Sequence, residues 1–208
     1  MADSTPYFVA LVPDQTLSAS VLRAKSKVLA VVGPQLYLDD PPHITAYLGA
    51  FRSEDAARDA FLRITDALPP FDVHTTGWHV YMADVLTGKN TLVAAIAHDA
   101  ASRLRQAQEC IVRAMAPYRD SSACERRYRN SWESLTPQRQ LAVRTTGFPF
   151  IGSDWQPHVT VASITPADWP PVWEVLHREP IVGPHRCDAM ALYRLNGLAP
   201  EELLRVPA

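Results

Sequence analysis

This sequence has no excess of positive charge, and lysine in particular is scarce. Only three of the 20 basic residues are lysines, the other 17 are arginines, and 22 acidic residues leave a formal net charge of −2. A protein that coats long nucleic acid through bulk electrostatics needs a large positive charge, so this class is excluded. Any recognition of a nucleotide or an RNA must therefore come from a local site.

Glycine is also sparse, with eight residues in 208, and no glycine-rich phosphate loop is found. The G-x-S-x-G motif of hydrolases and the H-E-x-x-H motif of zinc proteases are missing as well. We therefore expect neither a cofactor nor a resident metal ion.

Cysteine is infrequent in the sequence, and long apolar runs are absent. Cys110, Cys124 and Cys187 are odd in number and widely spaced, which excludes a disulfide framework and a zinc knuckle. The apolar run 7–12 is too short for a signal peptide, and no run has the length of a membrane span. We expect a cytoplasmic protein with free thiols and no membrane contact, and a monomer by default.

The sequence does contain a pattern that occurs twice. Residues 7–82 and 91–195 each follow the order strand, helix, strand, helix, strand. The polar segment 118–153 interrupts the second copy, and we expect an irregular loop insertion there, suited to a lid or a substrate loop. The pattern predicts one α+β domain over residues 1–208, made of two pseudo-symmetric lobes.

Apolar periodicity and turn residues place the individual elements. Strands are expected at 7–12, 42–51, 71–82, 91–97, 155–164 and 187–195, although 91–97 also fits the start of a helix. Helices are expected at 17–32, 53–68 and 100–115, and from Thr165 onward.

Two of three His-x-Thr sequences share a longer form. They are Pro42-His43-Ile44-Thr45 and Pro157-His158-Val159-Thr160, at matching places in the two copies. The third, His74-Thr75-Thr76, lacks the flanking residues, and we interpret His74 as an ordinary strand histidine.

Strand geometry explains the spacing within these two HxT motifs. Positions i and i+2 project from the same face, so His43 and Thr45 point one way while Ile44 points into the core. An imidazole exchanges protons near neutral pH, and a threonine hydroxyl donates to a phosphate oxygen. Two such strands could place a base, an acid and two donors around one phosphate without a metal.

Two HxT motifs on strands of a duplicated chain resemble the 2H phosphoesterase superfamily, in particular its bacterial 2′-5′ RNA ligase and cyclic phosphodiesterase group. Tyr47-Leu48-Gly49 after the first motif also resembles the usual continuation in that family. The resemblance implies two small, mostly antiparallel sheets flanking a central cleft, with helices outside. It also implies that His43, Thr45, His158 and Thr160 line the cleft and act on 2′,3′-cyclic phosphates or 2′-5′ phosphodiesters.

Other residues are weaker candidates for substrate binding. The 118–153 segment has a net charge of +3, and its Arg126, Arg129 and Arg144 suit bidentate phosphate binding. Trp155, three residues before His158, could wall the cleft or cap the strand.

We therefore predict a hydrolase that acts on a nucleotide or a short RNA end, and several alternatives remain open. The chain could instead ligate 2′-5′ ends, degrade cyclic oligonucleotide signals, or bind nucleotides or RNA without catalysis. A plain structural domain is a further alternative. The sequence does not decide which histidine is the base and which is the acid.

Overall fold

The chain has an α+β fold, as the sequence predicts. The structure is a computed structural model, and it describes residues 4–64, 70–97, 101–197 and 199–207. Its strands are β1 (Thr5–Pro13), β2 (Ile44–Phe51), β3 (Phe71–Tyr81), β4 (Asn90–Ile96), β5 (His158–Ile164), β6 (Val182–Asn196) and β7 (Ala199–Pro207). Its α-helices are α1 (Gln15–Val32), α2 (Glu54–Leu62), α3 (Ala101–Met115), α4 (Ser121–Arg127), α5 (Pro137–Thr146) and α6 (Trp169–Leu176). Short 3-10 turns are η1 (Ala116–Tyr118), η2 (Arg129–Ser134) and η3 (Gly152–Asp154).

One strand joins the two lobes. Within the described residues the strands form a single sheet in the order β2-β1-β6-β3-β4-β5, all pairs being antiparallel, and β7 pairs with β6. The segment 187–194 of β6 pairs with β1, whereas its segment 182–187 pairs with β3. The two small sheets that the sequence predicts are therefore two halves of one continuous sheet.

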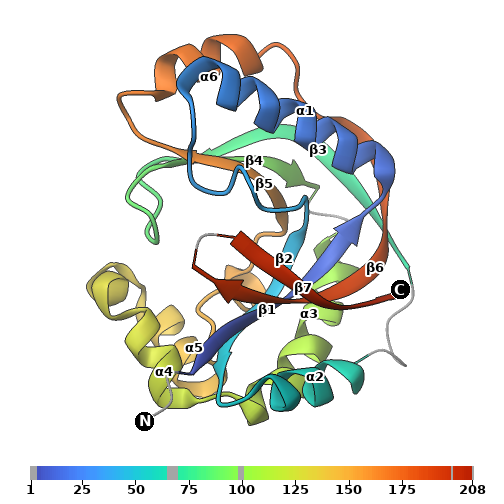
Figure 1. Ribbon diagram of the computed structural model, residues 1–208, viewed down its shortest axis with the longest axis vertical. Helices are drawn as coiled ribbons and strands as arrows, with labels where there is room; N and C mark the ends of the chain where they lie inside the picture. Colours follow the sequence, from blue (N-terminus) through green and yellow to red (C-terminus); the bar gives the residue numbers. More distant parts are fainter. Residues whose placement is uncertain (1–3, 65–69, 98–100, 198, 208) are drawn as a thin grey trace.

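The helices are exchanged between the lobes. Helix α1, which belongs to the first copy of the pattern, packs against α6 and β5 of the second copy. Helix α3 of the second copy packs against α2 and β2 of the first. Figure 1 shows α1 and α6 on one side of the sheet, with α2 and α3 on the opposite side.

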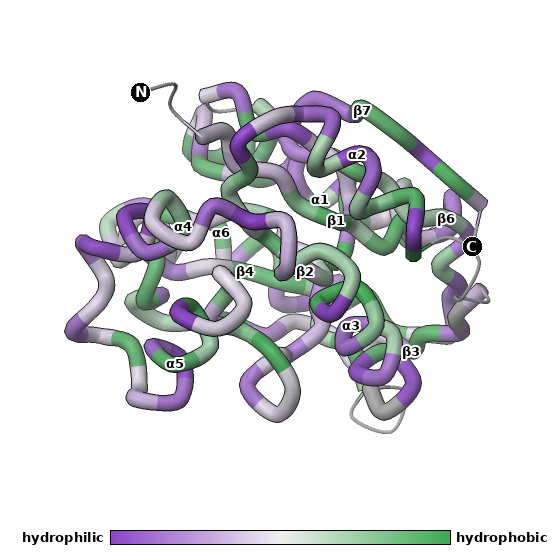
Figure 2. Tube along the Cα trace, turned by 90° about the horizontal axis from the view of Figure 1, so that it is seen from below, coloured by the Kyte–Doolittle hydropathy of each residue, from purple (hydrophilic) through white to green (hydrophobic). Residues whose placement is uncertain are grey.

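Local signals explain the bounds of α1. The Asp14 carboxylate accepts a hydrogen bond from the Leu17 backbone nitrogen at 2.8 Å, which caps the first turn. Gly33 ends the helix with a φ of 75°, a value that glycine adopts without strain. The buried stripe consists of Leu17, Val21, Ala24, Lys25 and Val28. In Figure 2 hydrophilic segments are frequent along the outer helices and loops, whereas β7 shows hydrophobic segments at the edge of the molecule.

The 118–153 segment differs from the expected irregular loop, because most of it is helical. It contains α4, η2 and α5, capped by the side chains of Asp120 and Thr136 and ended at Gly147, whose φ is 86°. The Asp120 backbone nitrogen donates to the Ala50 carbonyl at 2.8 Å, so the insertion is fixed to β2. Capping residues were visible in the sequence, but short helices of this kind gain their stability from packing that periodicity does not reveal.

Two other expectations about the elements were wrong. Helix α6 begins at Trp169, with Asp168 at its N-cap, and not at Thr165. Strand β6 is longer than expected and is followed by β7, which the duplicated pattern does not contain. The turn between them begins at Asn196-Gly197, a dipeptide typical of hairpins. The predicted end of the second helix, at 65–68, lies outside the described residues.

All three cysteines are free thiols, and Cys124 and Cys187 are buried. Within the described residues, no helix is both long enough and apolar enough to cross a membrane.

Candidate active site

The first HxT motif lies at the start of β2. The Nδ1 atom of His43 is 2.7 Å from the Pro41 carbonyl oxygen. Because a carbonyl only accepts hydrogen bonds, Nδ1 carries the proton, and Nε2 keeps its lone pair in the neutral ring. The Thr45 hydroxyl lies 3.1 Å from this Nε2, which places His43 and Thr45 on one face of the strand, as the sequence predicts.

The second motif repeats this arrangement at the start of β5. The Nδ1 atom of His158 is 2.7 Å from the Gln156 carbonyl oxygen, again two residues earlier. The same reasoning leaves its Nε2 as the basic nitrogen. Both histidines and both threonines are half-buried. The two motifs therefore present the same atom of imidazole in the same local setting.

A β-bulge follows the threonine of each motif. In the β1–β2 pairing, Ala10 lies opposite Thr45 and Val9 opposite Tyr47, so Ala46 has no partner. In the β4–β5 pairing, Val161 is left without a partner in the same way, between Thr160 and Ala162. Bulges bend a strand and redirect its side chains, and they are frequent beside active sites. The sequence spacing alone could not reveal them.

One hydrogen bond ties the two motifs together. The indole nitrogen of Trp155 donates to the Thr45 carbonyl oxygen at 3.0 Å. Trp155 is only 3% exposed, so it connects the approach to β5 with β2 from within the core. The same indole therefore contributes to the position of both motifs, while its contact with a substrate stays a prediction.

Burial and neighbouring charges lower the pKa of both imidazoles. Burial lowers the pKa of His43 to about 4, the Pro41 carbonyl opposes this, and the charges of Lys25 and His158 add to it. Burial lowers the pKa of His158 as well, opposed by the Gln156 carbonyl and the Asp84 carboxylate. The charge of His158 thus acts on His43, and their membership of one site stays a prediction.

Aromatic side chains pack beside each histidine. The ring of Phe8 lies 4.8 Å from that of His43, measured between centroids, and Tyr193 stacks on Phe8 at 4.9 Å. The Tyr81 ring lies 5.4 Å from that of His158. These rings exclude water from one side of each imidazole, consistent with the lowered pKa values.

A buried lysine holds the loop that leads to His43. Lys25 is 4% exposed, and its ammonium donates to the carbonyls of Tyr37 and, at 2.9 Å, of Asp40. Tyr37 has a φ of 72°, in the left-handed region that non-glycine residues rarely adopt. Because the Pro41 carbonyl that orients His43 follows directly, Lys25 contributes to the position of His43. A lysine within the apolar stripe of α1 was the signal for it in the sequence.

The three predicted arginines lie together, but apart from the HxT residues. Arg126, Arg129 and Arg144 line a cavity of about 580 Å³, and Arg144 stacks over the Trp132 ring at 5.2 Å. All of the residues lining this cavity belong to the insertion. Their role in substrate binding stays a prediction.

His74 lies on β3 with an exposed side chain. Among the described residues, no group of three or more histidine, cysteine, aspartate or glutamate side chains is arranged to hold a metal ion.

Known proteins share both a sequence family and a fold with this chain. The sequence model of the 2′-5′ RNA ligase superfamily matches residues 13–198. None of the curated proteins that were compared matches the chain. The LigT protein of E. coli in its apo form is 12% identical, with a TM-score of 0.57 and coverage of 99% of this chain and 98% of that one. Usb1 of Kluyveromyces marxianus is 13% identical, with a TM-score of 0.53 and full coverage of both chains. TT0787 of Thermus thermophilus is 19% identical, with a TM-score of 0.53 and 97% coverage of each.

Proposed function

Because the chain belongs to the 2′-5′ RNA ligase superfamily, we propose that it is a metal-independent phosphoesterase with two catalytic histidines. Its substrate is a 2′,3′-cyclic phosphate or a 2′-5′ phosphodiester at the end of a nucleotide or an RNA. The observation that carries this proposal is the repeated setting of His43 and His158, each with Nδ1 fixed by a carbonyl two residues earlier. Two half-buried histidines with a purely structural role would have no reason to repeat this detail.

The electrostatics favour one assignment of the acid and the base for hydrolysis. His43, with a pKa of about 4, is neutral at physiological pH, so its Nε2 accepts the proton of the attacking water. Burial also lowers the pKa of His158, but the Asp84 carboxylate opposes this effect, so we assign His158 as the general acid. As water forms its bond to phosphorus, the bond to the ribose oxygen breaks, and His158 gives its proton to that oxygen. In the ligation direction the two roles are reversed.

The threonines complete the site in this proposal. Negative charge accumulates on the non-bridging oxygens of the phosphate in the transition state, and hydroxyl donors stabilise it. Thr45 and Thr160 are the donors placed beside each histidine. Trp155 acts as a positioning residue through its bond to the Thr45 carbonyl.

Nucleotides in solved relatives support the class of substrate. LigT of E. coli has been solved with 3′-AMP, and Usb1 of Kluyveromyces marxianus with uridine monophosphate. Both ligands combine a nucleoside with a phosphate, as the proposed substrate does.

Alanine variants of the two histidines provide the direct test. His43→Ala and His158→Ala are each expected to lower kcat by about 10²–10⁴-fold, and the double variant by little more, because the pair acts as one unit. His74→Ala is the matched control, since it removes the third His-x-Thr histidine, and it should keep full activity. EDTA should leave the rate unchanged. The measurement is turnover of a panel of cyclic and 2′-5′ linked substrates, with products identified by mass spectrometry.

Near-full turnover in either single variant, on every substrate that the wild type accepts, would refute the mechanism. Tight binding of nucleotides without turnover of any of them would favour a non-catalytic binding module instead.

A further inference from the structure

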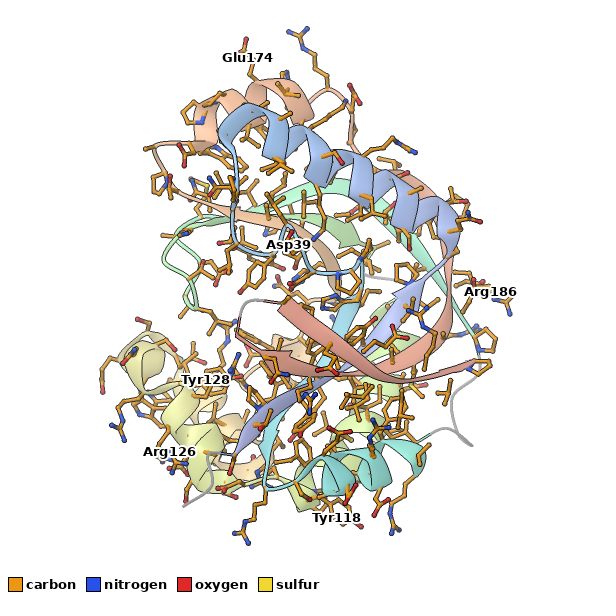
Figure 3. The ribbon with its side chains drawn as sticks, viewed as in Figure 1. Asp39, Tyr118, Arg126, Tyr128, Glu174 and Arg186 are labelled. Atoms are coloured by element: carbon orange, nitrogen blue, oxygen red, sulfur yellow. The ribbon has the colours of Figure 1, made fainter. Side chains whose placement is uncertain are left out.

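A second cavity lies where the insertion meets the β3–β4 turn. Its volume is about 510 Å³, within the range of about 300–1,000 Å³ that is usual for small-ligand sites. It is lined by Tyr37 of the loop before β2, Leu48 of β2, Val85 and Leu86 of the turn, and Arg127 and Tyr128 at the end of α4, among others. We call it the insertion pocket. In Figure 3, Tyr128 lies toward the β3–β4 turn and Arg126 lies farther from it, in agreement with their different cavities.

Contacts on both sides connect this pocket with the two histidines. Leu48 packs against the cluster that contains Phe8, and the Phe8 ring contacts that of His43. On the other side, Val85 and Leu86 line the pocket directly after Asp84, whose carboxylate acts electrostatically on His158. A ligand that extends from the reacting phosphate toward Leu48 would reach the pocket.

The walls of the pocket are held in place. Asp84 organises the β3–β4 turn by accepting from the backbone nitrogen of Leu86 at 2.8 Å and from the Thr91 hydroxyl at 2.7 Å. The insertion is anchored to β2, because the Tyr47 hydroxyl donates to the Thr146 carbonyl at 2.7 Å. A site with fixed walls loses little entropy when a ligand binds.

One charged group of the pocket is available to a ligand. Tyr128 lines the pocket but is only 3% exposed, and its buried hydroxyl interacts with the neighbouring Arg127 guanidinium. Arg127 is exposed and forms no ion pair with a described residue. Its guanidinium can therefore pair with a phosphate.

The lining combines flat apolar walls with a polar edge. The apolar surface comes from Leu48, Val85 and Leu86, and the Tyr37 ring provides an aromatic face. The side-chain amide of Asn130 can form hydrogen bonds with the edge of a nucleobase. A nucleobase has apolar faces and a polar rim, and a nucleotide adds one phosphate. These are the requirements that this lining meets.

We propose that the insertion pocket binds the nucleotide adjacent to the one whose phosphate reacts, with its base against Tyr37 and Tyr128 and its phosphate paired with Arg127. The substrate is then an oligonucleotide end of at least two residues and not a mononucleotide. This inference rests on the proposed function, because it takes the reacting phosphate to lie between His43 and His158.

Binding without turnover is the first test, since it does not depend on catalysis. Calorimetry would compare a 3′-phosphorylated dinucleotide with a 3′-mononucleotide. The wild type should bind the dinucleotide at least about tenfold more tightly, as expected for one added charged contact and a stacked base. Arg127→Gln should remove most of this difference and leave mononucleotide binding unchanged. Arg113→Gln, an equal charge change at an exposed position of α3, is the matched control and should bind both ligands as the wild type does.

The interaction between Tyr128 and Arg127 is tested with Tyr128→Phe, which keeps the buried ring. This variant removes the hydroxyl that positions the Arg127 guanidinium, so it should bind the dinucleotide about threefold to tenfold more weakly and should bind the mononucleotide as the wild type does.

The possible failures are distinguishable. Equal binding of dinucleotide and mononucleotide by the wild type, or equal effects of Arg127→Gln on both, would overturn the pocket assignment even if His43→Ala abolished turnover. A dinucleotide preference that depends on Arg127, found together with no turnover by the wild type, would instead support the pocket and refute the proposed catalysis.

Discussion

In the proposed mechanism, single backbone atoms orient the two imidazoles for proton transfer. The carbonyls of Pro41 and Gln156 fix the Nδ1 protons of His43 and His158, so only Nε2 of each ring can exchange a proton with a substrate. In many enzymes a carboxylate performs this orientation and strengthens the imidazole as a base. A neutral carbonyl orients the ring and opposes the lowering of its pKa only in part, so the effect of burial prevails and both pKa values are low.

The lowered pKa values give a defined expectation for the pH profile. The plot of kcat/KM rises as His43 loses its proton, near its pKa of about 4, and falls as His158 loses its proton, below the ordinary value of 6.5. Its maximum should therefore lie below pH 6.5. A bound phosphate stabilises imidazolium, so the profile of kcat should be displaced to higher pH.

Steady-state kinetics between about pH 4 and 9 would measure both profiles. The acid and alkaline limbs of each profile report apparent pKa values of the histidine pair and not of single residues, because the charges of His43 and His158 interact. A maximum of kcat/KM above about pH 7 would contradict the low pKa values.

Lys25 provides a second prediction at the level of one residue. Lys25→Met removes the donor to the carbonyls of Tyr37 and Asp40 and should lower the free energy of unfolding by about 2–3 kcal/mol. The loss of its charge should also raise the pKa of His43, because that charge lowers it, and shift the acid limb of kcat/KM to higher pH.

Lys27→Met is the matched control on the same helix. Its ammonium forms a surface ion pair with Glu179, so this variant should lose less than about 1 kcal/mol and keep the wild-type pH profile. Urea unfolding and the pH dependence of kcat/KM are the two measurements. An unchanged acid limb in Lys25→Met would contradict the role of Lys25 at the site.

At the level of elements, the strands and helices that follow from the local spacing of apolar residues could be predicted from the sequence. Features that depend on which segments pair with each other could not. The apolar middle residues of the two HxT motifs, Ile44 and Val159, predicted strands with one buried face, and both residues are buried in β2 and β5. The bulges at Ala46 and Val161 arise from the register with β1 and β4, which no local pattern records. For the same reason Lys25 was visible as a lysine in an apolar stripe, while the carbonyls that it binds were not.

The insertion carries the prediction that belongs to this level. If its arginine cavity holds the distal part of a longer substrate, the triple variant Arg126→Gln, Arg129→Gln and Arg144→Gln should raise KM for oligonucleotides of several residues. It should also weaken the dependence of log KM on log salt by about 0.7 for each arginine–phosphate pair removed, and leave short substrates unaffected. Arg23, Arg103 and Arg113 are exposed, and the same three changes there form the control. An unchanged KM at low salt for every length of substrate would refute this role.

For the whole molecule, the central feature is the strand that both lobes share. Because β6 pairs with β1 along one part and with β3 along another, the distance between the HxT motifs is set within one sheet. The duplication predicted two lobes, but pairing between distant segments could not be read from the chain. The exchange of α1 and α3 was hidden for the same reason.

That exchange predicts how fragments behave. A chain cut in the β3–β4 turn, between Thr87 and Gly88, separates α1 from β5 and α3 from β2. Each fragment alone should show no cooperative thermal transition, because its helix lacks the apolar surface that it buries. Mixing the fragments should restore a transition, followed by circular dichroism, and turnover. Cooperative unfolding of either fragment by itself would contradict this expectation.

Neither repeat of this fold is therefore complete alone. The first helix of each repeat buries its apolar face against the other repeat, and the single HxT motif of each has its counterpart there. The two repeats are for this reason one folding unit, unlike two domains that a linker joins.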